Sequence, residues 1–302
     1  MRAARIAAKA VARLLAGTLI VTTVSYLLAR SALGNPLAGL GAAGSLPATA
    51  AEQLRRIYGL DEPLPVGLAS FIAGVLRLDT GYSLVYAAPA YPLAAESLAY
   101  TLLALLPGAL GGLALFALVY LAAGEAGLRI LRPAAFIPGF IYAVAASLVA
   151  WYTGFYSTLP SLEPQKLVVY SLVACLVVAP RLSHVMLEVV EGGEARLYEQ
   201  RYAAIGAPRL RSRLALMRIY LAPLASYLLA STTLLLEHSV FIEPILGYPG
   251  AGYLLYTAVS RGDPVLAATL FTLLGSVSYT LIALGEALEP ILDPRLWSIE
   301  AP

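Results

Sequence analysis

This 302-residue chain is divided by six uncharged, apolar runs, which lie at residues 14–29, 97–124, 133–160, 167–180, 219–236 and 264–285. A helix needs about 20 mostly apolar residues to cross a membrane. Of all residues, 60% are hydrophobic and 13% are charged, whereas a soluble domain has about 25% charged residues. A core of this size cannot bury so much apolar surface, so the solvent of these runs must be lipid. The sequence predicts an all-α, polytopic membrane protein with about six transmembrane helices.

Two of the runs are short for a membrane span. The fourth has to continue past Arg181 towards Leu187, and the first can borrow flanking residues whose long basic side chains reach the interface. The basic residues ahead of the first run also fit a cleaved signal peptide. That run is long for a signal peptide and Arg30 follows it at once, so we expect a retained first helix.

The placement of lysines and arginines predicts the orientation of the chain. With the N-terminus inside, thirteen of these residues fall on the cytoplasmic side and six outside, with Arg181 left in a span. We therefore expect a multi-pass protein of the cell membrane with both termini in the cytoplasm. Three parts follow: an N-terminal transmembrane helix at 1–30, a small external segment at 31–96, and a five-helix core at 97–302.

Local signals predict the structure of the connecting segments. In the external segment we expect a short polar helix ending at Gly59 and an amphipathic or interfacial helix over residues 67–78, followed by a turn. Residues 125–132 should form a short cytoplasmic link. Pro138-Gly139 predicts a kink in the third transmembrane helix.

Residues 191–218 form the one long polar segment between two apolar runs. A helix is predicted over 195–205, and Gly206 supplies the left-handed residue that ends many helices. Pro208 then begins a second helix, which carries several arginines before the chain re-enters the bilayer. Two interpretations stay open. The segment is a helix that docks on a cytoplasmic partner, or it is a solvated basic linker.

Residues 237–263 are too short and too interrupted to cross the membrane, so we expect a re-entrant or reaching loop packed in protein. Its sharp turn, GYPGAG, contains Gly247, Pro249, Gly250 and Gly252. The turn lies near a passage through the membrane or is an ordinary extracellular turn. Glu243 beside it lines that passage or caps a short helix. We place Glu237 and His238 at the outer interface, because a charge in mid-bilayer is costly.

The sequence lacks the residue patterns for ATP binding, metal binding and aspartyl proteolysis. There is no phosphate-binding GxxxxGK[ST] motif, so any ATP that drives the protein must bind another chain. The two histidines, His184 and His238, lie apart and offer no metal cluster. All four aspartates fall outside the predicted spans, which excludes a membrane aspartyl protease. We expect no catalytic residues, metal, cofactor or nucleic-acid partner.

The polar segment resembles the cytoplasmic loop of permease subunits of ATP-driven (ABC) importers. Gln200-Arg201-Tyr202 stand at an acidic-small-small triplet of that family, Gly206 at its glycine and Pro223 at a later proline. The triplet departs from the pattern, since the acid is missing at Gln200, with Glu199 next to it, and Tyr202 is large. Five further segments, in order, resemble the dipeptide/oligopeptide/nickel permeases: IYGLDEPL (57–64), LDTGYSL (78–84), IEPILGYPGAG (242–252), SRGDP (260–264) and ILDPR (291–295).

The resemblance implies a permease subunit that forms the translocation path of a solute importer and couples it to separate ATPases. The expected partners are a second homologous permease, two ATP-binding subunits, an external substrate-binding protein and membrane lipid. The coupling residues implied are Glu199, Gln200, Arg201, Tyr202, Ala203 and Gly206. The expected cargo is peptide, with oligosaccharide, nickel or another solute left open. An ATP-independent channel or facilitator and a structural membrane scaffold remain the alternatives.

Overall fold

A computed structural model of the chain describes residues 2–32, 62–157, 159–191 and 194–292. These residues are helical apart from short connections and one isolated antiparallel bridge between Tyr82 and Pro89. The helices are α1 (Arg2–Ala32), α4 (Leu64–Arg77), α5 (Ala90–Ala123), α6 (Glu125–Leu131), the 3-10 helix η1 (Arg132–Phe136), α7 (Gly139–Thr153), α8 (Pro164–Glu191), α9 (Glu194–Ala204), α10 (Arg209–Ile219), α11 (Leu221–Leu246), α12 (Ala251–Ser260) and α13 (Pro264–Leu292). The expected helix ending at Gly59 and the segment ILDPR from Asp293 onward lie outside the described residues.

Five helices in the described part are long and apolar enough to cross a membrane. These candidate spans are Val11–Ser31, Ala90–Ala123, Pro164–Glu191, Pro223–Leu246 and Pro264–Leu288. A sixth span results if Glu125–Phe136 and Gly139–Thr153 are taken together, although they bend by 89° at the break between them. The all-helical fold with five to six spans is thus confirmed. The fourth run does continue beyond Arg181, as its length required.

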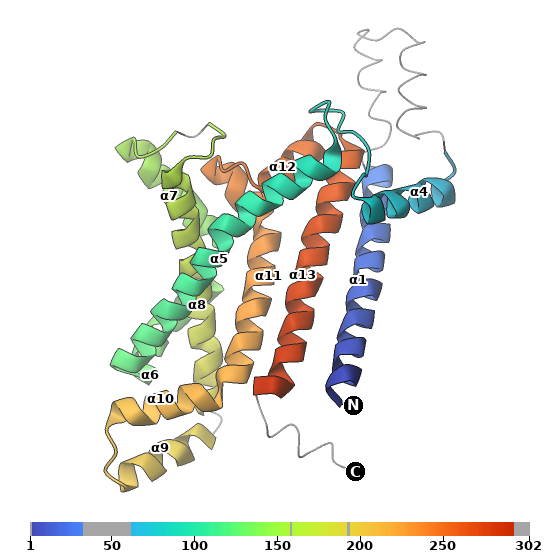
Figure 1. Cartoon of the computed structure of the whole chain (residues 1–302). Helices are drawn as coiled ribbons and strands as arrows, with labels where there is room; N and C mark the ends of the chain where they lie inside the picture. The colour runs from blue at the N-terminus through green and yellow to red at the C-terminus, as the bar shows by residue number, and fades with distance from the viewer. Residues whose placement is uncertain (1, 33–61, 158, 192–193, 293–302) are drawn as a thin grey trace.

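The long helices form one bundle in which α5 packs along α8, and α13 packs between α1 and α11 (Figure 1). Small residues allow the first of these contacts. A Cβ atom at Gly108 would lie 2.5 Å from the Cβ atom of Ala174, and one at Gly112 would lie 2.7 Å from the Cβ atom of Val178. Such close approach of backbones is the usual way in which membrane helices associate. It fixes α5 against α8 over much of their length.

The two ends of the bundle carry different elements. The start of α1, the end of α13, and helices α9 and α10 lie at one end, which we call the loop end (Figure 1). Helices α4 and α12 lie at the opposite end, which we call the α12 end (Figure 1). The short amphipathic helix expected over 67–78 is α4, and its Phe71 packs against Tyr26 of α1 with ring centroids 5.4 Å apart.

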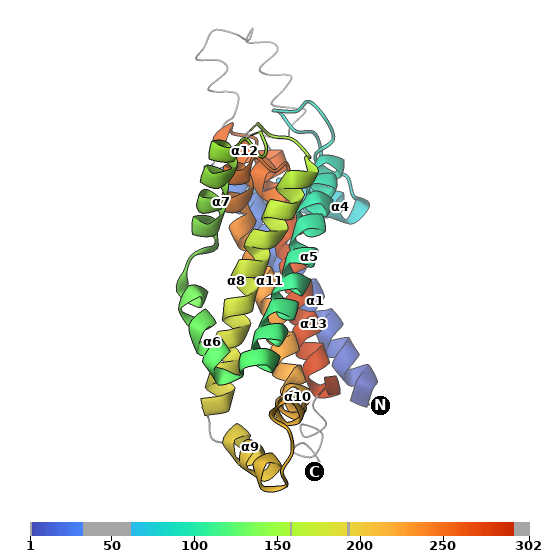
Figure 2. The same cartoon turned by 90° about the vertical axis from the view of Figure 1, so that its left-hand side faces the viewer.

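Three sequence-based expectations need correction. The link at 125–132 is the helix α6 followed by the start of η1. The kink expected at Pro138 is a complete break, because Ile137 and Pro138 are extended (ψ 122° and 139°) and no helical turn bridges them. Figure 2 shows α6 near the loop end and α7 near the α12 end, joined by this extended stretch.

The third correction concerns the loop expected from residue 237. Helix α11 continues through Glu237 and His238 to Leu246, and only residues 247–250 form a turn before α12. The helix can continue because the Glu237 side chain is exposed, so its charge is not buried in the bundle. Tertiary partners that are distant in sequence bind the next carboxylate, that of Glu243.

Candidate functional site

The helix–glycine–helix segment folds as the sequence predicts. Helix α9 ends at Ala204, and Gly206 adopts the left-handed conformation with φ 68°. The N–H of Ala207 donates to the carbonyl of Tyr202 at 2.9 Å, and the N–H of Gly206 donates to that of Ala203 at 3.0 Å. These two bonds are the Schellman pattern, which satisfies the last carbonyls of a helix. A Cβ atom at position 206 would meet nothing within 4 Å, so glycine is required by the backbone conformation and not by space.

A single arginine joins this segment to the long helix α5. Arg213 Nη1 donates to the carbonyl oxygens of Leu121 at 2.7 Å and of Ala122 at 3.1 Å. Those carbonyls belong to the last turn of α5, where a cation is favoured by the helix dipole. The guanidinium lies over Gly124, which has φ 66°, and a Cβ atom there would lie 2.6 Å from Arg213 Nη2. Gly124 therefore gives Arg213 its access to the helix end.

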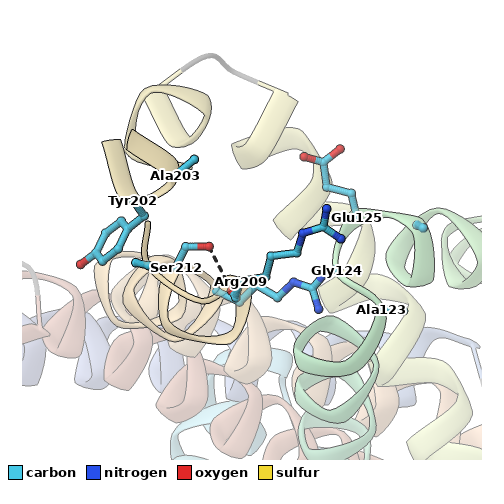
Figure 3. A pocket seen from close by; sticks show the side chains of 10 residues that line it. Ala123, Gly124, Glu125, Tyr202, Ala203, Arg209 and Ser212 are labelled. Carbon is cyan, nitrogen blue, oxygen red and sulfur yellow. Dashed lines mark hydrogen bonds between the residues drawn. The ribbon is translucent and has the colours of Figure 1, made fainter. Parts of the chain in front are cut away.

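A cavity of about 370 Å³ separates the segment from the corner between α5 and α6. Tyr202 and Ala203 from α9 and Arg209 and Ser212 from α10 line one part, and residues 123–126 line the other (Figure 3). Of the predicted coupling residues, Tyr202 and Ala203 thus face α10 and α5. Gln200 and Arg201 are exposed.

Two other predicted coupling residues complete the description of this segment. Gly206 lies at the turn beyond α9, and Glu199 belongs to α9 by its backbone, whereas its side chain lies outside what the structure describes. The arrangement offers a short helix that is mostly exposed, with Tyr198 packed against the core of the bundle, and it can contact a partner at the loop end.

The predicted turn residues lie at the α12 end and pack tightly on α11. Gly247 has φ 62° and ends α11, and the N–H of Tyr248 donates to the Glu243 carbonyl at 2.9 Å. A Cβ atom at Gly250 would lie 2.5 Å from the Glu243 carboxylate, and one at Gly252 would lie 2.3 Å from the backbone carbon of Ser239. Both glycines therefore permit a close approach of chain segments. Pro249 lies in the turn between Gly247 and Gly250.

Glu243 is fully buried and all its described contacts are hydrogen bonds from neighbouring elements. Its Oε1 accepts the hydroxyls of Thr101 at 2.7 Å and of Tyr170 at 3.1 Å, and its Oε2 accepts the N–H of Tyr253 at 2.9 Å. Tyr253 lies in the first turn of α12, so the carboxylate caps that helix from a distance. Glu243 thus joins α5, α8 and α12 on one side chain.

Tyr248, in the turn itself, extends this cluster. Its hydroxyl donates to the Tyr100 carbonyl at 2.7 Å, and its ring contacts that of Tyr170 edge-on at 5.3 Å. Burial is the main cause that raises the pKa of Tyr248, and the nearby Glu243 carboxylate adds to it. The phenol therefore stays neutral and holds the turn on α5.

Asp263 forms a second buried carboxylate site that sequence reasoning did not single out. Its Oδ2 accepts the hydroxyl of Ser83 at 2.5 Å and the N–H of Val85 at 3.1 Å, and its Oδ1 accepts the N–H of Leu266 at 3.0 Å. The segments LDTGYSL and SRGDP, which carried the resemblance, therefore contact each other here. The Asp-Pro pair at the start of the last apolar run could have indicated this site, because aspartate is a common residue at the N-terminal cap of a helix.

Lys166, which the sequence placed outside the membrane, is buried at the start of α8. Its ammonium donates to the carbonyls of Leu159 and Gly247 and to Ser161 Oγ. Glu163 lies 3.7 Å from it, and a hydrogen bond from the Ser161 hydroxyl is the main cause that lowers the pKa of Glu163. The lysine thereby ties the connection between α7 and α8 to the end of α11.

No group of three or more His, Cys, Asp and Glu side chains that could hold a metal occurs among the described residues. Both buried carboxylates bind donors of the protein itself, not each other.

Comparison with known proteins finds relatives along nearly the whole chain. They are named "Putative peptide transport system permease protein", and that from Brucella abortus (strain 2308) is 27% identical over 318 aligned residues, covering 95% of this chain and 97% of the relative. A relative of the same description from Brucella suis biovar 1 (strain 1330) is 26% identical over 316 residues. Another, from Brucella melitensis biotype 1, is 27% identical over 318 residues. No protein-family model matches the chain. The resemblance predicted from the ordered segments is confirmed by this similarity.

Proposed function

We propose that this chain is a transmembrane permease subunit of an ATP-driven solute importer, and that its cargo is peptide. The observation that carries the proposal is the similarity to peptide transport system permeases over 95% of the chain. The five to six candidate spans support it, since they suit a translocation path.

The partners follow from the same proposal. A second permease completes the path, two ATP-binding subunits supply the energy, and an external binding protein delivers the solute. The parts of the chain keep the boundaries predicted above: a first helix at 1–30, an external segment at 31–96, and a core at 97–302 that contains the coupling loop at 191–218. The loop end is cytoplasmic in this proposal, and the α12 end faces outward.

In the proposed mechanism the exposed helix α9 binds the ATPase, and the ATPase moves it during the nucleotide cycle. Gly206 holds α9 and α10 at a fixed angle, so movement of α9 is transmitted to α10. Arg213 then passes the movement to the last turn of α5. The chain itself carries out no chemistry, and the helices change which side of the membrane the path faces.

Replacement of Gly206 by valine tests the coupling role. A β-branched residue in the left-handed conformation costs about 1–2 kcal/mol, so the turn should rearrange. Gly154→Val is a matched control, because Gly154 also follows a helix and has φ 64°, and a Cβ atom there would likewise meet nothing within 4 Å, but it lies at the end of α7. Both variants should insert into the membrane in equal amounts.

The measurement is substrate-stimulated ATPase activity of the reconstituted complex. We expect Gly206→Val to lose most of the stimulation while basal ATP hydrolysis and membrane insertion persist, and Gly154→Val to keep it. Equal stimulation in both variants would refute coupling through this turn. If the purified chain conducts solute with no ATPase present, an ATP-independent facilitator explains the chain better than a permease subunit. If solute uptake is the same after a co-purifying ATPase is removed, a structural membrane scaffold explains the chain better than a permease subunit.

A further inference from the structure

Arg181 is a cation inside the apolar helix α8, in the candidate span Pro164–Glu191. Its Nη1 atom is buried and has no hydrogen-bond partner, and no carboxylate in the described part of the chain forms an ion pair with it. A charge within a membrane span is costly and marks a functional position by default. An unpaired buried donor adds to that cost. Nη1 of this guanidinium can therefore bind a group that the described residues do not supply.

The neighbourhood of Arg181 is formed by α7, α8 and α11. A Cβ atom at Gly139 of α7 would lie 3.4 Å both from Val177 of α8 and from Ile242 of α11, which lie about one helical turn from Arg181 and from His238 respectively. The Tyr142 hydroxyl is already used, because it donates to the Ala134 carbonyl at 3.0 Å. His238 resembles Arg181 in one respect, since its Nδ1 atom is buried and has no hydrogen-bond partner. Two nitrogens thus remain available where α7, α8 and α11 meet.

His238 also lines a large apolar groove between the start of α7, the second half of α11 and α12. The groove has a volume of about 720 Å³, and its walls include Phe140, Phe241, Ile245, Tyr253 and Tyr256. Phe241 and Tyr256 are more than half exposed. The groove therefore joins an aromatic surface near the α12 end to the imidazole. Apolar walls with a few convergent polar groups are typical of small-molecule sites.

The guanidinium of Arg181 selects an anion. An arginine binds a carboxylate through two parallel hydrogen bonds, and these charged bonds are about twice as strong as neutral ones. Glu237, next to His238, does not fill this role, because its side chain is exposed and makes no ion pair with Arg181. A solute that carries a free carboxylate and an apolar body suits both the arginine and the aromatic walls of the groove.

We propose that Arg181, with His238 beside it, binds the carboxylate of the transported solute, and that the groove accommodates its apolar part. The inference rests on the proposed function, because it takes the face formed by α7, α8 and α11 as part of the path. It narrows the cargo to carboxylate-bearing solutes, of which a peptide with a free C-terminus is the simplest.

Binding of trialanine and of trialanine amide to the full-length chain tests this inference. The chain is purified in lipid nanodiscs with the subunits that accompany it, and equilibrium binding of the two probes is compared. The probes differ only in the terminal carboxylate. The variants are Arg181→Gln and Arg181→Lys, and the control is Arg129→Gln, an exposed arginine of α6 whose partner Glu125 lies 3.0 Å away. Because Arg181 has no ion-pair partner to lose, Arg181→Gln should keep the melting temperature of the wild type.

We expect the wild type to bind the free acid about 10- to 100-fold more tightly than the amide. Arg181→Gln should abolish this preference, Arg181→Lys should keep part of it, and Arg129→Gln should keep all of it. A preference that survives in Arg181→Gln overturns the inference.

A carboxylate could also come from a side chain of the second permease. In that case the wild type shows no preference between the probes and Arg181→Gln weakens assembly of the complex, which also overturns the inference. A failure of the proposed function looks different. ATP-driven uptake into proteoliposomes is then absent, while the preference in the binding measurement still decides whether the carboxylate site exists.

Discussion

At the α12 end, Glu243 and Asp263 are fully buried and each accepts hydrogen bonds from at least two other elements of the chain. At the loop end, α9 and α10 are mostly exposed, and the described hydrogen bonds from their side chains to the rest of the bundle come from Arg213. The first region is a network in which both carboxylates have their donors. The second is a pair of helices whose side-chain hydrogen bonds to the bundle come from one arginine, with Leu216 of α10 and Tyr198 of α9 as apolar contacts to the core.

This difference shows how one chain can combine a fixed framework with a movable part. A buried network whose groups are all satisfied specifies one arrangement and is costly to disturb. Segments with few buried contacts move at low free-energy cost. Substitutions should therefore reduce stability at the α12 end and impair coupling at the loop end.

The largest effect on stability is expected for Glu243→Ala. It leaves the Tyr170 hydroxyl and the Tyr253 N–H without their acceptor, whereas the Thr101 hydroxyl keeps the Ser97 carbonyl at 3.3 Å. Each buried orphan costs about 1–3 kcal/mol, so the total is on the order of 2 kcal/mol or more. Glu237→Ala, on the same helix but exposed, is the control. Thermal unfolding of the detergent-purified chain measures the difference, and equal melting temperatures for the two variants would contradict the comparison.

Gly252→Ala should have a smaller but clear effect on stability. The new Cβ atom would lie 2.3 Å from backbone atoms of Ser239, which cannot move aside as a side chain can. Such overpacking costs about 1–3 kcal/mol. The same substitution at Gly206 meets no atom and costs only the strain of its positive φ, about 1 kcal/mol. The order of melting temperatures, with Gly252→Ala below Gly206→Ala, checks this prediction, and the reverse order would refute it.

The smallest effect on stability is expected for Arg213→Ala, which removes two hydrogen bonds to the end of α5. Since water can replace them at a partly exposed site, the loss is about 1 kcal/mol. Substrate-stimulated ATPase activity should nevertheless fall strongly, because α10 loses its attachment to α5. Arg211→Ala, an exposed arginine of the same helix, should change neither quantity. If both variants keep full stimulation, the point of attachment lies elsewhere.

Local signals predicted the loop end well. Gly206 and Pro208 determine where α9 ends and α10 begins, and their conformations depend on neighbours in the chain. The contact of Arg213 with α5 could not be predicted, because its acceptors lie 91 and 92 residues away and are backbone carbonyls. A sequence shows that an arginine is present, but not which helix end it reaches.

The α12 end was predicted less well for a related reason. Glu237 and His238 indicated the end of a span, because charge is costly in lipid, yet α11 continues to Leu246. The compensation for Glu243 comes from Thr101 and Tyr170, which are 142 and 73 residues away. Only the folded chain brings these donors together. The glycines of the turn did indicate a tight packing site, which the close approach of Gly252 to Ser239 explains.

Helix α5 connects the two ends of the molecule mechanically, because the loop end and the α12 end are both hydrogen-bonded to it. Arg213 donates hydrogen bonds to the α5 carbonyls of Leu121 and Ala122, and Glu243 accepts one from Thr101 of the same helix. About twenty residues of helix separate these two points, or about 30 Å. A displacement at one end of this helix reaches the other end together with α8, which packs along it between the two points. Pro107 lies between the two points and interrupts the internal hydrogen bonding of the helix. The displacement that α5 can transmit from one end to the other is therefore limited by how far the helix bends at Pro107.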